Sequence, residues 1–268
     1  MIQEGYMIRS MRDLFNYREL LYALTWRDIK VKYKQSIMGV MWAIFMPALV
    51  ISAGVLVKFA FARLSGTPLG LSQIATVSVK AIPWSFFIAS LRSGTNSLTG
   101  NVNLVSKIYF PNEVFPISAV LSQLFDLAIA SFVLILILVC AQIGWSVYLL
   151  WAPILLGLLI LLAVAATLLL SAANLFFRDV KYIVEVIVTF AIFFTPVFYE
   201  ADFMGTTWKP IILLNPVAPI LEGLNACIVL KKMPEMGWIA YSTTVTITLF
   251  LASFMFFKKM EPAFAENI

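Results

Sequence analysis

Four ionisable residues lie in or beside long apolar stretches: Lys58, Arg92, Asp126 and Glu185. An ionisable group in hydrocarbon costs roughly 2.5–3.5 kcal/mol on insertion scales, so each is a candidate for a functional role or for a partner. Lys58 and Glu185 lie near the ends of their stretches, where their side chains can reach water. Asp126 lies well inside its stretch and needs a partner. Arg92 is one possible partner, and such a pair would serve structure or transport equally well.

A polar stripe surrounds one of these residues. Arg92, Asn96 and Thr99 recur at i, i+4 and i+7, which places them on one face of a helix. This stripe either lines an aqueous path or packs against another helix, and the sequence leaves both alternatives open.

The residue types exclude most enzyme chemistry. The chain of 268 residues has no His and only two Cys, Cys140 and Cys227, which read as small buried hydrophobes. Histidine bases, nucleophile–histidine dyads and His- or Cys-built zinc sites are therefore absent from the sequence. A proton relay usually needs several carboxylates or histidines across the membrane, and this chain has one buried Asp and no His. We expect no catalytic residue, no metal site and no cofactor bound by this chain.

The composition predicts an integral membrane protein. Hydrophobic residues make up 62% and charged residues 12%, against about 45–50% and about 25% in soluble domains. Runs near the length of about 20 residues that a helix needs to cross a bilayer recur along the chain. We expect an all-α transmembrane domain covering residues 1–268, with six spans at about 37–59, 74–98, 115–143, 147–176, 182–199 and 236–257.

The N-terminal arm reads as an amphipathic helix over 7–34 that lies in the cytoplasmic interface. Its apolar residues fall within an arc of about 120° at 100° per residue, and Asp28 and Lys32 interrupt that arc. Arg27, Lys30 and Lys34 lie on the far side. A soluble tail that supplies only positive charge is the alternative.

Basic residues are distributed unevenly between the two sides of the predicted membrane. With the N-terminus inside, twelve of the 19 Lys and Arg residues lie in internal segments, and five lie outside, with Lys80 among them. Positive charge collects on cytoplasmic loops, so we expect both termini to be cytoplasmic. The net charge of +5 then reflects topology and not a nucleic-acid partner.

Two connections are too long to be simple turns. The internal one covers 100–116, and the external one covers 200–235. The external connection holds two apolar pieces that are too short to span and are broken by proline, which is typical of re-entrant segments. A loop lying flat on the membrane surface is the alternative.

Aromatic residues concentrate in two of the predicted spans. Such residues form the ordinary interfacial belt of a membrane protein or, alternatively, a stacking surface for sugar rings. The residues concerned are Trp84, Phe86 and Phe87 in the second span, and Phe190, Phe193, Phe194, Phe198 and Tyr199 in the fifth.

Several segments together resemble one family, the type-2 ABC permeases that export O-antigen, capsule and teichoic acid polysaccharides. The resemblance covers almost the whole chain in the same order. The segments that carry it are 26–36 with 38–43 and Pro47, Pro83-Trp84 with Phe86-Phe87, 96–98 with 101–104, 107–111, 174–180, and 195–199 with Asn215-Pro216.

The resemblance implies a homodimer with a channel between its subunits and two separate ATPase subunits on the cytoplasmic side. The chain has no Gly-x-x-x-x-Gly-Lys-Ser/Thr phosphate loop, so ATP and Mg²⁺ are expected on the partner. Contact with that partner is expected on the interface helix and the coupling segment 101–113. The coupling residues implied are Arg27, Lys30, Lys34, Asn103, Lys107, Tyr109, Phe110, Pro111 and Glu113.

The same resemblance implies external gate helices within 207–230 and sugar-facing residues in the channel. The gate residues are Trp208, Pro210, Asn215 and Pro216, and the sugar-facing residues are Trp84, Phe87, Arg92, Asn96, Phe194, Phe198 and Tyr199.

The sequence therefore predicts the permease subunit of an ATP-driven exporter that moves a lipid-linked polysaccharide, such as O-antigen, across the bacterial inner membrane. Membrane lipids would surround it. The alternatives are a type-2 ABC exporter of small hydrophobic molecules or lipids, and a carrier or scaffold that has no ATPase partner.

Overall fold

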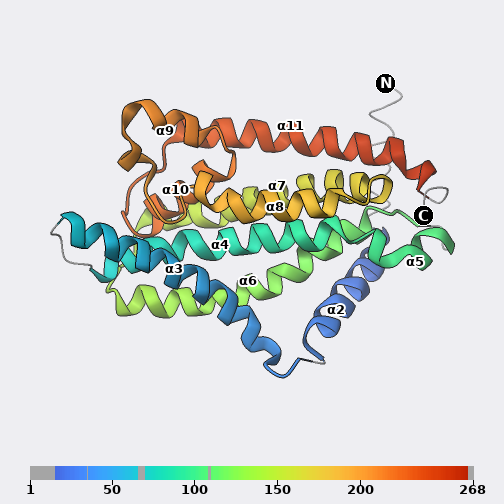
Figure 1. Cartoon of the computed structure of the whole chain (residues 1–268), viewed down its shortest axis with the longest axis horizontal. Helices are drawn as coiled ribbons and strands as arrows, with labels where there is room; N and C mark the ends of the chain where they lie inside the picture. The colour runs from blue at the N-terminus through green and yellow to red at the C-terminus, as the bar shows by residue number, and fades with distance from the viewer. Residues whose placement is uncertain (1–15, 35, 66–69, 108–109, 265–268) are drawn as a thin grey trace.

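The computed structural model describes residues 16–34, 36–65, 70–107 and 110–264, and these residues contain helices and no strand (Figure 1). The α-helices are α2 (Arg18–Lys34), α3 (Trp42–Ser65), α4 (Leu71–Thr95), α5 (Val102–Lys107), α6 (Val114–Cys140), α7 (Trp151–Phe176), α8 (Val180–Phe194), α9 (Gly205–Leu213), α10 (Val217–Ile228) and α11 (Met236–Met260). Short 3-10 helices lie at Gly39–Met41, Thr99–Asn101, Val147–Leu150, Ala201–Met204 and Glu261–Ala263.

Five helical stretches are long and apolar enough to cross a membrane, which confirms the prediction of an all-helical membrane protein. They are Gly39–Ala60, Leu71–Thr95, Val114–Cys140, Val147–Phe176 and Met236–Ala263. The fifth predicted span, 182–199, forms a shorter helix than expected. Its helix α8 has 15 residues, or about 22 Å of length against a hydrocarbon core of about 30 Å. It ends before Pro196, since proline disfavours the helical conformation in the residue that precedes it.

Helices α9 and α10 form a bent pair between α8 and α11. Thr207–Leu213 and Val217–Ile228 meet at 106°, with Asn215 and Pro216 between them. Taken together the two pieces are apolar enough for a sixth crossing, but the bend makes them either a broken span or a re-entrant loop. The proline breaks that the sequence carries in this stretch explain why no single long helix forms.

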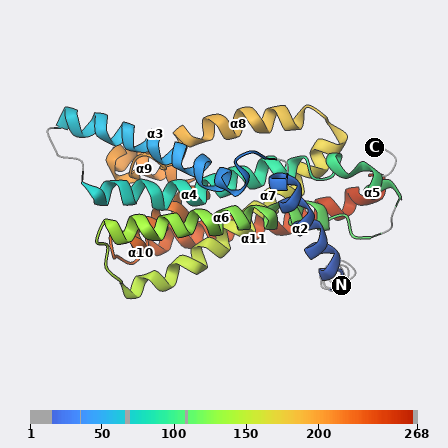
Figure 2. The ribbon, with the colours of Figure 1, turned by 90° about the horizontal axis from the view of Figure 1, so that it is seen from below.

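Helix α4 is the centre of the bundle. It packs against α3, α6, α7, α8 and α10, and most of its residues are buried. Gly94 permits its close approach to α7, because a Cβ at this position would lie 2.3 Å from Cγ2 of Thr167. Helix α11 packs on the far side of α7, and Figures 1 and 2 show these long helices running along the same axis.

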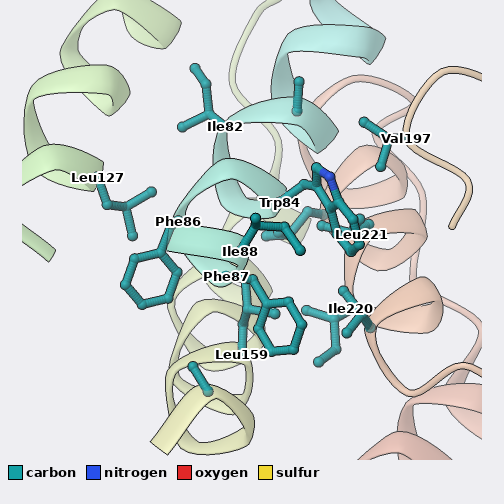
Figure 3. Close-up of a cluster of buried hydrophobic side chains, with 14 of the residues drawn as sticks. Ile82, Trp84, Phe86, Phe87, Ile88, Leu127, Leu159, Val197, Ile220 and Leu221 are labelled. Atoms are coloured by element: carbon teal, nitrogen blue, oxygen red, sulfur yellow. The ribbon is translucent and has the colours of Figure 1, made fainter. Parts of the chain in front are cut away.

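The main core lies around α4 in the half of the bundle that contains the bent pair. Trp84 and Phe87 of α4 contact each other, with ring centroids 6.1 Å apart, and pack with Leu159 of α7 and Leu221 of α10 in one cluster (Figure 3). This apolar contact joins α10 to the central helix.

A second core lies at the opposite end of the bundle. It joins Leu24 of α2 and Phe115 of α6 to Phe257 of α11 and to Phe264, which follows α11. Phe264 contacts Phe257 edge to face, with centroids 5.2 Å apart. The end of the bundle that contains α5 and the end of α11 (Figure 1) is therefore held together by apolar contacts among α2, α5, α6, α7 and α11.

One side of the molecule exposes large apolar residues. Helices α3 and α8 lie along the same edge in Figure 2, and Phe45, Leu56, Ile187 and Phe194 on them are all exposed. This surface suits lipid or another subunit and not water.

Candidate functional site

Asp126 of α6 is bound by two residues of α2. The ammonium of Lys32 and the hydroxyl of Tyr33 both donate to its carboxylate, and Lys32 Nζ also lies 3.0 Å from Gln123 Oε1. Burial and the neighbouring carboxylate raise the pKa of Tyr33 well above its usual range, so its hydroxyl remains a donor. The structure thus supplies the partner that Asp126 requires, and that partner is not Arg92.

Helix α2 docks through a face that the predicted apolar arc describes only in part. Leu24 is buried and Leu20 and Leu21 pack at the edge of the second core, but Val31 is 72% exposed. Lys32, which interrupts the arc, is the residue that anchors the helix to α6. In the sequence pattern Lys32 only interrupts the apolar arc, although a cation on an apolar face can indicate a carboxylate on the helix it packs against.

The C-terminal end of the coupling segment is fixed to the end of α11. Glu113 is completely buried, and Lys258 Nζ lies 2.7 Å from its Oε1. Lys258 also lies 2.9 Å from Glu261 Oε2, and Glu261 accepts hydrogen bonds from both the backbone and the side-chain amide of Asn112. We call this set, Asn112, Glu113, Lys258 and Glu261, the α6–α11 junction.

The junction changes the expectation for Glu113. Its side chain faces inward to Lys258, so it positions the segment in this structure and does not offer a free carboxylate to a partner. Phe110 is also buried, against Phe115 with centroids 5.4 Å apart. Pro111 is half-buried, whereas Asn103 of α5 is exposed. Tyr109 and the Lys107 side chain lie outside what the structure describes.

The basic residues predicted on α2 lie near the surface. Arg27 pairs with Asp28 at 2.8 Å, and Lys30 Nζ lies 5.6 Å from the ring centroid of Trp26. Lys34 lies in the last turn of the helix. None of these interactions holds α2 to the bundle.

The predicted polar stripe of α4 divides between two environments. Arg92 pairs with Glu185 of α8 at 2.7 Å, and both side chains are about half exposed. Asn96 and Thr99, beyond the end of α4, instead line a hollow of about 470 Å³. The first residue of the stripe therefore packs against another helix, and the other two face an open space.

A buried ion pair at the opposite end links α4 to α10. Lys80, 1% exposed, lies 3.2 Å from Glu222 Oε1 and donates to the backbone carbonyl of Tyr199 at 2.5 Å. Glu222 also accepts from the backbone N–H of Ala201 at 3.0 Å. The prediction that Lys80 lies in an external segment was wrong, because α4 begins at Leu71 and carries Lys80 into the core.

A second pair lies beside it, with Lys58 of α3 at 3.1 Å from Glu200. Lys58 therefore does not need to reach water, because the Glu200 carboxylate in the connection between α8 and α9 pairs with it. Sequence reasoning missed Glu222 and Glu200 as partners, since neither stands out within the polar external connection.

The turn between α9 and α10 is held by side-chain hydrogen bonds. Asn215 Nδ2 donates to Thr195 Oγ1 at 2.9 Å, and Asn215 Oδ1 accepts from the Val217 N–H. The carbonyl of Pro216 accepts from Ser242 of α11 at 2.6 Å. Two of the four predicted gate residues thus tie the bent pair to its neighbours, while Trp208 and Pro210 of α9 are exposed.

The aromatic residues predicted to face sugar separate into two groups. Trp84 and Phe87 are buried in the main core and face no open surface of the subunit (Figure 3). Phe194 is 75% exposed, and Phe198 and Tyr199 are half-buried. Only the α8 end of the aromatic set is open in the single subunit.

The described residues contain no group of three or more His, Cys, Asp or Glu side chains that could hold a metal ion. Their charged groups instead form ion pairs between helices, which position elements. The fold and these contacts define a multi-pass helical membrane protein with a bent apolar pair at one end and a fixed polar segment, with the docked helix α2, at the other.

The chain belongs to the ABC-2 type transporter family, whose sequence pattern matches residues 19–229. It is 28% identical over 268 residues to the O-antigen export system permease protein RfbA of Myxococcus xanthus, covering 98% of this chain and 100% of that protein. Two proteins of the same name from Klebsiella pneumoniae are 24% and 25% identical, each covering 92% of this chain and 94% of the relative.

Proposed function

We propose that this chain is the transmembrane subunit of an ATP-driven exporter that moves a lipid-linked polysaccharide such as O-antigen across the bacterial inner membrane. The observation that carries this proposal is the full-length similarity to an O-antigen export permease. The five long apolar helices and the bent pair are compatible with it. Two copies of the chain would form the path, and the exposed apolar edge along α3 and α8 supports such an assembly.

The energy would come from two copies of an ATPase that bind ATP and Mg²⁺. The surfaces offered to them are the basic residues of α2, of which Lys30 and Lys34 are exposed and Arg27 is half-buried, and the exposed residues Val102, Asn103 and Ser106 of α5. Because α2 is bound to α6 through Asp126, and 110–113 to α11 through the α6–α11 junction, a displacement of either surface would move a long helix. Rigid elements with two arrangements carry such motion between sites.

The bent pair α9–α10 would form the external gate. Its contacts are the Lys80–Glu222 pair and the hydrogen bonds of Asn215, which place it against α4 and the end of α8. Opening would then require these contacts to shift together with α4, the helix that also reaches the cytoplasmic end.

Deletion of the gene tests the substrate, because surface glycan should be lost and its lipid-linked precursor should accumulate inside. Purification of the tagged chain tests the partner, because an ABC ATPase should co-purify. Unchanged surface glycan would contradict the polysaccharide role and favour export of small hydrophobic molecules, and absence of any ATPase would favour a carrier or scaffold.

A further inference from the structure

A basic hollow lies where the end of α4 meets the turn between α7 and α8. It has a volume of about 470 Å³ and is lined by Asn96, Thr99, Gly100, Val102, Asn174, Leu175, Arg178 and Lys181. We call it the α4–α8 hollow. The end of α4 and the start of α8 lie at the same end of the bundle as α5 and the end of α11 (Figure 1). Five of the hollow's eight lining residues are polar or charged, and two of these five are cations.

A buried amide fixes the shape of this hollow. Asn174 is 1% exposed, and its Nδ2 donates to the Thr95 carbonyl at 3.0 Å and to Thr99 Oγ1 at 3.3 Å. Its Oδ1 accepts the backbone N–H of Lys181 at 3.1 Å. One side chain thus joins the α4 wall to the first turn of α8, and the hollow is preformed.

The charge in the hollow is not neutralised by its own wall. No carboxylate is among its described lining residues, and in the described part of the chain neither Arg178 nor Lys181 forms an ion pair. Lys181 Nζ lies 4.8 Å from the Tyr182 ring centroid. Asp179 at the start of α8 is the neighbouring acid, and it is exposed and outside the wall. Two cations without a carboxylate favour an anionic ligand.

The position of the hollow selects the kind of anion. The α7–α8 turn separates two membrane-associated helices at the end that carries α5, which is the cytoplasmic side under the proposed function. Basic pockets between helices at this depth bind lipid headgroups, and each Lys or Arg near an anionic membrane surface contributes about 1 kcal/mol. Arginine adds a planar fork that matches phosphate oxygens.

We propose that the α4–α8 hollow binds the phosphate of a lipid headgroup from the cytoplasmic leaflet, with Arg178 and Lys181 on the phosphate oxygens and Asn96 and Thr99 on its polar substituent. The phosphate belongs either to a leaflet phospholipid or to the lipid that carries the exported glycan. Since Gly100 directly precedes the coupling segment 101–113 and Val102 lies at its start, an occupied hollow holds this segment against α8. This inference rests on the proposed function, which places the hollow on the cytoplasmic side of the membrane.

The test measures lipid retention by the permease–ATPase complex in phosphatidylcholine nanodiscs doped with fluorescent phosphatidylglycerol. The R178Q/K181Q double variant should retain this lipid about 10–30-fold less well, as expected for two basic contacts. The matched control is K231Q/K232Q, which removes the same charge from exposed lysines after α10 at the other end of the bundle. Equal losses in both variants, or no loss in the first, overturn the proposal.

Competition separates the two sources of the phosphate. Two competitors are compared for displacing the fluorescent phosphatidylglycerol: an alkyl phosphate that bears an oligosaccharide, and unlabelled phosphatidylglycerol. If the glycosylated alkyl phosphate acts at a lower concentration, the ligand is the cargo lipid. If the two act at the same concentration, the ligand is a leaflet phospholipid. Either result supports the site, whereas equal competition by the same alkyl oligosaccharide without phosphate overturns it.

A further readout separates a lipid site from a protein contact. If R178Q/K181Q loses the ATPase subunit while lipid retention is unchanged, the hollow is a protein contact and the proposal is overturned. Failure of the proposed function is distinguishable, because it would appear in the unsubstituted chain as absence of the ATPase or of glycan export.

Discussion

At the scale of residues, charged groups within the helices of this membrane protein form ion pairs that connect one helix to another. Asp126 meets Lys32 from 94 positions away, and Arg92 meets Glu185 from 93. The sequence identified Asp126 as a group that needs a partner, because an isolated charge in hydrocarbon is costly. It did not identify the partner, since pairing over such separations depends on how helices pack and not on local pattern.

The Lys80–Glu222 pair permits a sharp test of this role. Lys80→Met should destabilise the protein by up to about 3 kcal/mol, because it leaves the Glu222 carboxylate, whose side chain is 22% exposed, without its cation. The measurement is the free energy of unfolding of the purified protein in detergent micelles. Replacing both residues, in K80M/E222M, should recover much of the loss, since a buried pair can often be exchanged for apolar groups.

Lys232→Met is the control for that experiment, because Lys232 is exposed and its charge is solvated. It should leave the free energy of unfolding nearly unchanged. If Lys80→Met behaves like Lys232→Met, the ion pair does not hold α10 to α4.

At the scale of elements, the residue pattern predicted the long helices well and the broken ones less well. Apolar runs of sufficient length gave α3, α4, α6, α7 and α11 near their observed positions. The helix α8 was predicted too long, because the apolar run continues to Tyr199 while Pro196 ends the helix at Phe194. The bend of α9 and α10 was predicted as two short pieces from their prolines, but its angle and its contacts depend on tertiary packing.

The contact between α4 and α7 makes a prediction about helix packing. Gly94→Ala should cost about 1–3 kcal/mol, as overpacking of a close contact does, because the added Cβ would lie 2.3 Å from Thr167 Cγ2. Thermal unfolding of the detergent-solubilised protein measures the loss. Removing the opposing side chain in G94A/T167G should recover part of it.

Gly157 of α7 provides the matched control, since a Cβ there would meet no atom within 4 Å. Gly157→Ala should be neutral or stabilise by up to about 1 kcal/mol through helix propensity. A similar loss in both alanine variants would show that the α4–α7 approach is not the cause.

The α6–α11 junction makes a prediction about coupling under the proposed function. Lys258→Met should leave the ATPase bound and active but lower glycan export by roughly 2–30-fold, the range that corresponds to 0.5–2 kcal/mol of coupling. The reason is that Glu113 and Glu261 lose the cation that holds residues 112–113 to α11. The ratio of polymer exported to ATP hydrolysed is the measurement.

Two variants bracket this result. Lys259→Met changes the exposed neighbour of Lys258 and should retain the full export ratio. The exchange K258E/E113K restores a pair of opposite charges and should regain part of the coupling. If Lys258→Met exports normally at an unchanged ratio, the junction is a structural contact without a role in coupling.

At the scale of the whole molecule, the composition and the apolar runs predicted an integral membrane protein, and the resemblance predicted its family, whereas the site was predicted only in outline. The positive-inside pattern and the apolar runs are summed over the whole chain, so a wrong boundary or a misplaced single residue changes them little. The surroundings of a single residue are harder to predict, as Trp84 and Phe87 show. An aromatic residue on a membrane helix gives the same sequence pattern whether it faces a channel or the core, and these two residues face the core. The direction in which these side chains point is determined by the contacts among α4, α7 and α10, and these contacts cannot be predicted from local sequence.

The orientation of the whole chain is the last prediction, and thiol labelling of intact cells tests it. Cys227 is buried and Cys140 is exposed, so C140S provides a background in which an impermeant maleimide should find no accessible thiol. In that background W145C, in the connection before α7 where Trp145 is 92% exposed, should be labelled from outside. K259C, near the end of α11, should be labelled only after permeabilisation, because the positive-inside rule predicts that the basic residues at the end of α11 lie in the cytoplasm. Labelling of K259C in intact cells, with W145C protected, would reverse the orientation and place the α4–α8 hollow and the α6–α11 junction on the outer side, where no ATPase could reach them.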